Sequence, residues 1–153
     1  MTKWTESKLR QSNVRKYRRM ESAEFWMIRG NDSFDQEKFE ESLVAYNLAL
    51  KIDPRNKSAM VGRGASLGAL GKHEEALKVF EKTLKFDPTY DVALRNKGLS
   101  LIQLERYREA IGFFNRALRL NPKDHSARYY KGVAYAKMGN NHKAVYLLTD
   151  HLR

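Results

Sequence analysis

Residues 57–90 read KSAMVGRGASLGALGKHEEALKVFEKTLKFDPTY, and they form one copy of a pattern that recurs along the chain. The three prolines of the sequence stand 34 residues apart, at Pro54, Pro88 and Pro122. Four glycines keep the same step, at Gly30, Gly64, Gly98 and Gly132. A period of this length is typical of repeat architectures, in which one supersecondary unit packs against copies of itself. Such a stack presents an extended surface rather than a closed catalytic pocket.

Each copy of the pattern predicts two helices. Small and apolar side chains recur every three or four residues in both halves of the copy, which is the spacing of an amphipathic helix. Gly71 and Lys72 interrupt this spacing between the halves. Asp87-Pro88 ends the second helix, because the residue before a proline disfavours the helical conformation. We therefore expect each copy to be a helical hairpin.

Small residues mark the places where the two helices of a hairpin must approach closely. In the second copy these are Gly64 on the first helix and Ala76 on the second, and Phe80 follows Ala76 by one helical turn. A larger side chain at a small position would force the helices apart at a cost of about 1–3 kcal/mol. We expect the aromatic side chain to fill the space that the small residues leave open. The equivalent residues in the neighbouring copies are Tyr46 and Phe114.

This pattern resembles the tetratricopeptide repeat family, in which Trp-x2-Leu-Gly-x2-Tyr, Ala-x3-Phe and Pro recur over 34 residues. The resemblance covers residues 23–153 and implies an all-α right-handed solenoid of four helix-turn-helix repeats. The repeats would span residues 23–56, 57–90, 91–124 and 125–153, the last one incomplete. Residues 1–22 would be a basic N-terminal extension that is helical in part. Ser42 departs from the pattern, since alanine is usual at that position.

The residue before each repeat glycine is also unusual, because it is basic instead of leucine. A ladder of cations along the stack is one interpretation. The alternative is that the long stems lie over the neighbouring repeat while the charged groups reach water. The four residues are Arg29, Arg63, Lys97 and Lys131.

The composition indicates a globular protein with an excess of positive charge. The 153 residues carry a net charge of +11, and 42% of them are hydrophobic. No apolar run approaches the roughly 18 residues that cross a bilayer, and residues 1–30 lack the apolar stretch of a secretory signal. With no cysteine, the chain has neither disulfides nor cysteine-ligated zinc, and we expect it to be cytoplasmic. The charge favours acidic partners, with solubility as the plainer explanation.

No arrangement of residues indicates catalysis. The string Gly62-Arg63-Gly64 lacks the third glycine of a nucleotide-binding loop and follows a predicted helix rather than a strand. The histidines have no partner at metal-ligand spacing. We therefore expect no enzymatic activity, no metal and no cofactor. The four histidines are His73, His125, His142 and His151.

In the family, the first helices of successive repeats line a concave groove that holds peptides or partner helices. This surface would be largely apolar here, with a few polar anchors, so we expect a protein or peptide partner of apolar and acidic character. The alternative is that these residues contact only their neighbours or are covered by the basic N-terminal segment. Carried over by register, the groove positions are Met27, Ile28, Asn31, Phe34, Val61, Gly62, Ala65, Gly68, Arg95, Asn96, Leu99, Ile102, Tyr129, Tyr130, Val133 and Lys137.

One subgroup of the family clamps the C-terminal carboxylate of chaperones with lysine, asparagine and arginine side chains. When the clamp is aligned to begin at the first repeat, none of its lysine or arginine positions holds a basic residue in this sequence. We therefore do not expect a chaperone-tail adaptor. Those positions are Met27, Asn31, Gly62, Val92 and Asn96.

The two ends of the chain suggest further interactions. The first repeat is net acidic and the fourth is net basic. One interpretation is head-to-tail self-association through an uncovered apolar face. The other is that the chain is a piece of a longer protein. The residues of that face are Val145, Leu147, Leu148 and Leu152. Alternative functions are a self-assembling coat, or nucleic-acid or anionic-surface binding through residues 1–22 and a basic ladder. The ladder consists of Lys51, Lys85, Arg119 and Arg153.

Overall fold

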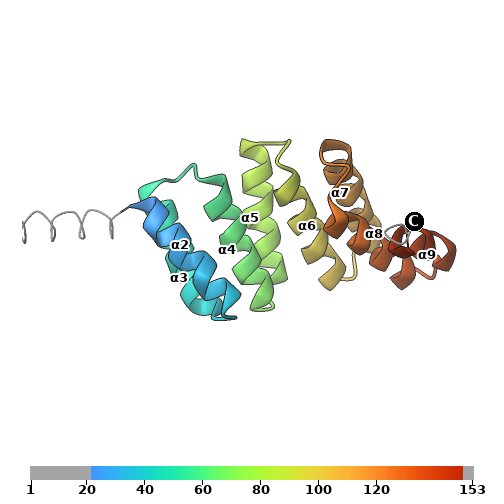
Figure 1. Ribbon diagram of the computed structural model, residues 1–153, viewed down its shortest axis with the longest axis horizontal. Coiled ribbons are helices and arrows are strands. Elements are labelled where there is room, and N and C mark those ends of the chain that lie inside the picture. Colours follow the sequence, from blue (N-terminus) through green and yellow to red (C-terminus); the bar gives the residue numbers. More distant parts are fainter. Residues whose placement is uncertain (1–21, 150–153) are drawn as a thin grey trace, which may run out of the picture.

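The computed structural model describes residues 22–149, and this part of the chain forms eight α-helices and no β-strand. Figure 1 shows the helices as one elongated row, with the first hairpin at one end and the last at the other. The predicted all-α stack of helical hairpins is confirmed. The helices are α2 (Ala23–Asp35), α3 (Phe39–Ile52), α4 (Lys57–Ala69), α5 (His73–Phe86), α6 (Asp91–Gln103), α7 (Tyr107–Leu120), α8 (His125–Lys137) and α9 (Asn141–Thr149).

A residue in the left-handed backbone conformation turns the chain between the two helices of each hairpin. Gly71 and Gly139 do so with φ of 77° and 76°, as expected for residues without a Cβ. Glu37 and Glu105 occupy the same place in the first and third hairpins with φ of 59°. The break predicted at Gly71 is thus confirmed. In two hairpins a glutamate makes the same turn, although a residue with a side chain adopts the left-handed conformation less readily than glycine.

The close approach of the two helices at the repeat glycines is confirmed. A Cβ placed on Gly64 would lie 2.5 Å from the Phe80 ring, and one on Gly98 would lie 2.7 Å from the Phe114 ring. In the first hairpin the ring of Tyr46 fills this space against Gly30. Leu148 takes the place of the aromatic residue in the fourth hairpin, where it packs against Gly132.

The core is divided along the stack. Among the described helices, contacts join consecutive helices and also the first helices of neighbouring hairpins, namely α2 with α4, α4 with α6 and α6 with α8. Three clusters of buried apolar side chains result, centred on Tyr46, Phe80 and Phe114. Each hairpin is therefore stabilised by its immediate neighbours, as in other repeat proteins.

The serine that departs from the alanine pattern makes a buried polar contact between hairpins. Ser42 on α3 and Ser66 on α4 are both fully buried, and their hydroxyl oxygens lie 2.9 Å apart. The hydroxyl of Ser66 donates to the carbonyl oxygen of Gly62, so the hydroxyl of Ser42 donates to Ser66. Both buried hydroxyls thus have a hydrogen-bond partner, which avoids the cost of burying an unpaired polar group.

The basic residues that precede the repeat glycines differ in their surroundings. The ammonium of Lys97 lies 3.0 Å from Glu81 on α5 and 4.4 Å from the centre of the Phe113 ring. The Nε of Arg63 is buried without a hydrogen-bond partner, and burial lowers the pKa of its guanidinium. Burial and the nearby charge of Lys143 lower the pKa of Lys131. Lys97 thus contacts the preceding repeat through its ammonium, and its side chain is 13% exposed.

Candidate functional site

A pocket of about 470 Å³ lies between the first helices of all four hairpins. Six of the residues predicted for the groove line it, and they come from α2, α4, α6 and α8. The structure thus brings together side chains that are far apart in the sequence. We call this space the central pocket, and its defining residues are Phe34, Ala65, Gly68, Asn96, Leu99 and Tyr130.

Two of the predicted groove residues are buried between helices. Val61 is 8% exposed and belongs to the cluster around Phe80. Ile102 is 9% exposed and belongs to the cluster around Phe114. Their side chains pack against neighbouring helices, so they offer a partner almost no surface.

The other apolar and aromatic positions lie outside the central pocket. Ile28 and Tyr129 are about half exposed, and the ring of Tyr129 packs edge-on against Tyr130 at 5.1 Å. The hydroxyl of Tyr46 donates to the side-chain oxygen of Asn31 at 2.6 Å, which holds that predicted anchor against the first hairpin. Of the remaining positions apart from Arg95, Met27, Gly62 and Val133 are partly buried and Lys137 is exposed.

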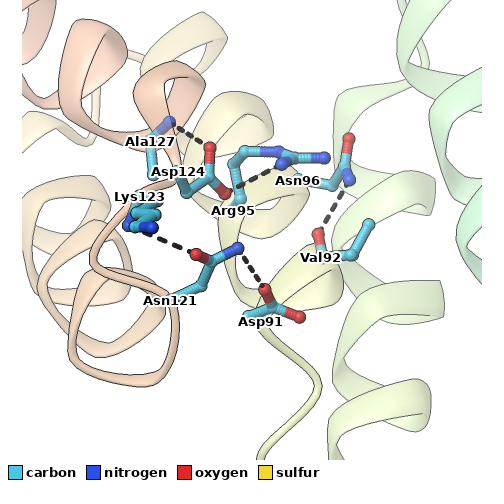
Figure 2. A network of polar contacts seen from close by, with 8 residues as sticks. All are labelled: Asp91, Val92, Arg95, Asn96, Asn121, Lys123, Asp124 and Ala127. Carbon is cyan, nitrogen blue, oxygen red and sulfur yellow. Dashed lines mark hydrogen bonds and ion pairs between the residues drawn. The ribbon is translucent and has the colours of Figure 1, made fainter.

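Arg95, a predicted polar anchor, is held by an ion pair within the protein. Its guanidinium lies 2.8 Å from a carboxylate oxygen of Asp124, whose side chain is only 4% exposed (Figure 2). The other carboxylate oxygen of Asp124 accepts the backbone N–H of Ala127 and so caps α8. The side-chain nitrogen of Asn96, beside Arg95, donates to the carbonyl oxygen of Val92. The arginine therefore links the third and fourth hairpins.

The central pocket is also lined by residues outside the predicted groove positions. Ala69 and Gln103 line it at the ends of α4 and α6. Gln103 stands one repeat and Ala69 two repeats before the predicted groove residue Lys137, so all three occupy the same repeat position. Applying that position to every repeat would have identified Ala69 and Gln103. His73 also lines the pocket, and the buried Ser100 reaches it from α6. No charged lysine, arginine, aspartate or glutamate lines the central pocket among the described residues.

The predicted self-association face is exposed in part. Val145 on α9 is 60% exposed, whereas Leu147 and Leu148 pack against Gly132 of α8. Leu152 lies outside the described residues. In the predicted basic ladder, Lys51, Lys85 and Arg119 are exposed at the ends of their helices, and Arg153 again lies outside the described residues, as do residues 1–21.

Residues 22–149 contain neither a metal-binding cluster nor a membrane-spanning helix. No cluster of histidine, aspartate or glutamate side chains in this range could hold a metal ion. None of the helices described here has the length and apolar content to cross a membrane.

Three solved structures illustrate the similarity of this fold to known proteins. The thermophilic TPR protein TTC0263 of Thermus thermophilus is 20% identical, with a TM-score of 0.80 over 85% of this chain and 73% of that one. A tetratricopeptide repeat protein of Parabacteroides merdae is 27% identical, with a TM-score of 0.72 over 86% of this chain and 53% of that one. The first TPR of Spaghetti (RPAP3), bound to the HSP90 peptide SRMEEVD, is 22% identical, with a TM-score of 0.71 over 76% of this chain and 93% of that one.

A search among curated proteins gave no match. Family profiles described as tetratricopeptide repeat match residues 23–56, 58–90, 92–124 and 113–146. The first three matches each contain one hairpin, and the fourth joins most of α7 to α8 and the start of α9. With this periodicity, these hairpins and these matches, the chain belongs to the tetratricopeptide repeat family.

Proposed function

We propose that this chain is a non-catalytic protein-interaction module, and that it binds a peptide segment of a partner protein in the central pocket. The observation that carries the proposal is the pocket itself, which spans the first helices of all four hairpins. Its volume is within the range of about 300–1,000 Å³ found for ligand sites. One structure of the same fold, the first TPR of Spaghetti, holds a peptide.

The physical advantage of such a site is preorganisation. The lining side chains stand on helices that are packed on both sides, as with Leu99 on α6 and Ala65 on α4. A docking segment would therefore lose its own conformational freedom while the protein loses little, which favours affinity.

A peptide selection tests the proposal. Peptides are selected from a displayed random library against the folded protein, and their affinities are measured by fluorescence anisotropy. Ala69→Trp places a bulky side chain at an exposed position in the pocket, so we expect it to abolish binding. Val44→Trp is the matched control, since Val44 is 58% exposed on α3 and lies outside the pocket. Equal binding by the two variants would exclude the central pocket as the site.

A second candidate function is head-to-tail self-association. Val145 and Tyr146 on α9 are 60% and 55% exposed, and residues 125–149 contain basic but no acidic side chains. The first repeat is net acidic and offers a surface of opposite charge. Light scattering across protein and salt concentration tests this candidate. A mass that grows with concentration and falls with salt supports it, and a constant monomer mass rejects it.

A further inference from the structure

Small residues of the second repeat line much of the central pocket. Helix α4 presents Ala65, Gly68 and Ala69 where α6 has Leu99, Ile102 and Gln103 at the same repeat positions. A Cβ placed on Gly68 would meet no atom within 4 Å. The pocket therefore has open space at the position where the third repeat carries a large apolar side chain.

A hydroxyl without a hydrogen-bond partner in the protein reaches this space. Ser100 is 5% exposed and lines the central pocket, and no group within residues 22–149 hydrogen-bonds to its hydroxyl. Its counterpart one repeat earlier, Ser66, contacts the hydroxyl of Ser42. In the next repeat Ala76 occupies the position of Ser42, so the contact that Ser66 makes with Ser42 has no equivalent at Ser100. A bound group that covers this hydroxyl without hydrogen-bonding to it would incur the cost of burying an unpaired polar group. A bound group that hydrogen-bonds to it would avoid that cost.

Apart from the imidazole of His73, the remaining polar groups of the pocket are amides and a phenol. The amide of Asn96 donates to Val92 through its nitrogen, and its oxygen lies at the opposite side of the amide (Figure 2). Gln103 and Tyr130 add an amide and a phenol to the lining. The one nearby guanidinium on the same helix, that of Arg95, is paired with Asp124. An inserted carboxylate or ammonium would lose its hydration without gaining a lysine, arginine, aspartate or glutamate partner in the lining, so an uncharged occupant matches it best.

We infer that the central pocket takes the side chain of a tyrosine from an extended peptide, with the phenol oxygen hydrogen-bonded to the hydroxyl of Ser100. This inference rests on the proposed function and names the residue that the pocket selects. An aromatic ring fills the apolar space above Gly68, and its hydroxyl supplies the partner that Ser100 lacks. Phenylalanine would fill the same space and leave Ser100 unpaired. The expected acidic character of the partner is not required by this pocket.

The test uses two small probes, N-acetyl-tyrosinamide and N-acetyl-phenylalaninamide, titrated into ¹⁵N-labelled protein and followed by NMR. We expect saturable shifts at the amides of Ala65, Gly68 and Ser100, with the tyrosine probe binding about three- to tenfold more tightly because of the extra hydrogen bond. In Ser100→Ala the two probes should bind equally. Equal binding to the unmodified protein, or a preference that survives Ser100→Ala, would overturn the inference.

Two glycine variants test the position of the ring. Gly68→Leu fills the open space, so we expect the shifts of the tyrosine probe to be lost. Gly112→Leu is the control, since Gly112 is also helical and lies on α7 outside the pocket, and a Cβ placed on it would likewise meet no atom within 4 Å. Retained binding in Gly68→Leu would contradict the inference.

The peptide selection separates this inference from the proposed function. Selected peptides that lose binding in Ala69→Trp and share a tyrosine support both. Selected peptides that depend on Ala69 in this way but share no tyrosine overturn the inference and leave the proposed function standing. A library that yields no binding peptide counts against both.

Discussion

Gly98 and Gly112 are both helical glycines of the third hairpin, but only Gly98 is needed for packing. A Cβ on Gly98 would lie 2.7 Å from the ring of Phe114, and a Cβ on Gly112 would meet nothing within 4 Å. We expect Gly98→Ala to lower the free energy of unfolding by about 1–3 kcal/mol through overpacking. Gly112→Ala should raise it by about 0.5–1 kcal/mol, because alanine favours the helix.

Urea unfolding followed by circular dichroism measures both free energies. The two alanine variants differ in sign if the contact with Phe114 decides the outcome. The same sign for both would show that the space beside Gly98 can adapt, and that helix propensity alone decides the effect of the substitution.

At the scale of the helix, Asp124 combines two roles at the start of α8. It accepts the N–H of Ala127 as the helix cap and pairs with Arg95 of the preceding hairpin. Asn56 holds the same repeat position and caps α4 through the N–H of Ala59. We expect Asn56→Ala to cost about 1 kcal/mol and Asp124→Ala about 2–3 kcal/mol, since the latter also leaves Arg95 unpaired.

Chemical denaturation of the two variants measures how much each substitution lowers the free energy of unfolding. Introducing Arg95→Met together with Asp124→Ala should recover part of the loss, because no unpaired guanidinium remains. Equal losses for Asn56→Ala and Asp124→Ala would mean that the ion pair adds nothing to the cap.

The ends of α4 and α5 are joined by Lys57 and Asp87. The hydrogen bond from Lys57, followed by those from Thr89, lowers the pKa of Asp87. Because the folded-state pKa of Asp87 lies below its unfolded value, the pair stabilises the folded protein at pH values above the unfolded pKa, which is about 3.9 for aspartate. This stabilisation is lost as the pH falls through the folded-state pKa. We expect Lys57→Met to raise the pKa of Asp87 and to weaken this acid-sensitive contribution.

An NMR titration of the Asp87 carboxyl carbon measures the pKa in both proteins. Lys51→Met serves as the control, because it removes an exposed charge from α3 and leaves the pair intact. An unchanged pKa of Asp87 in Lys57→Met would show that Thr89 alone holds the carboxylate in its charged form.

At the scale of the whole molecule, the stack depends on contacts between neighbouring hairpins. Each inner hairpin contacts one on either side, whereas α9 contacts only α8 among the described helices and buries one side chain, Ala144. We expect hydrogen exchange to be slowest in α4 to α7 and fastest in α9, because local opening requires the least loss of packing there.

Exchange detected by mass spectrometry resolves these helices. A core substitution in the last hairpin should speed exchange in α8 and α9 and leave α4 unchanged. A uniform change along the whole stack would indicate that the protein unfolds as a single cooperative unit.

Much of the fold could be predicted from the sequence because it depends on contacts within one repeat. The ring of Phe80 against Gly64 is an example, since both residues belong to the same hairpin. The pocket was predicted in part, since register placed Ala65 and Leu99 in the groove. Register alone could not exclude Val61, whose burial depends on how closely the next helices pack.

The spacing of prolines and glycines by itself determined the hairpins, their ends and their stacking, because helix periodicity and turn chemistry are local properties. Only the tertiary structure decided which polar groups remain available to a partner. Arg95 is paired by Asp124 and Ser66 by Ser42, whereas the hydroxyl of Ser100 reaches the central pocket. The physical reason is that each of these outcomes depends on the distance between side chains of different hairpins, which the packing of the stack sets.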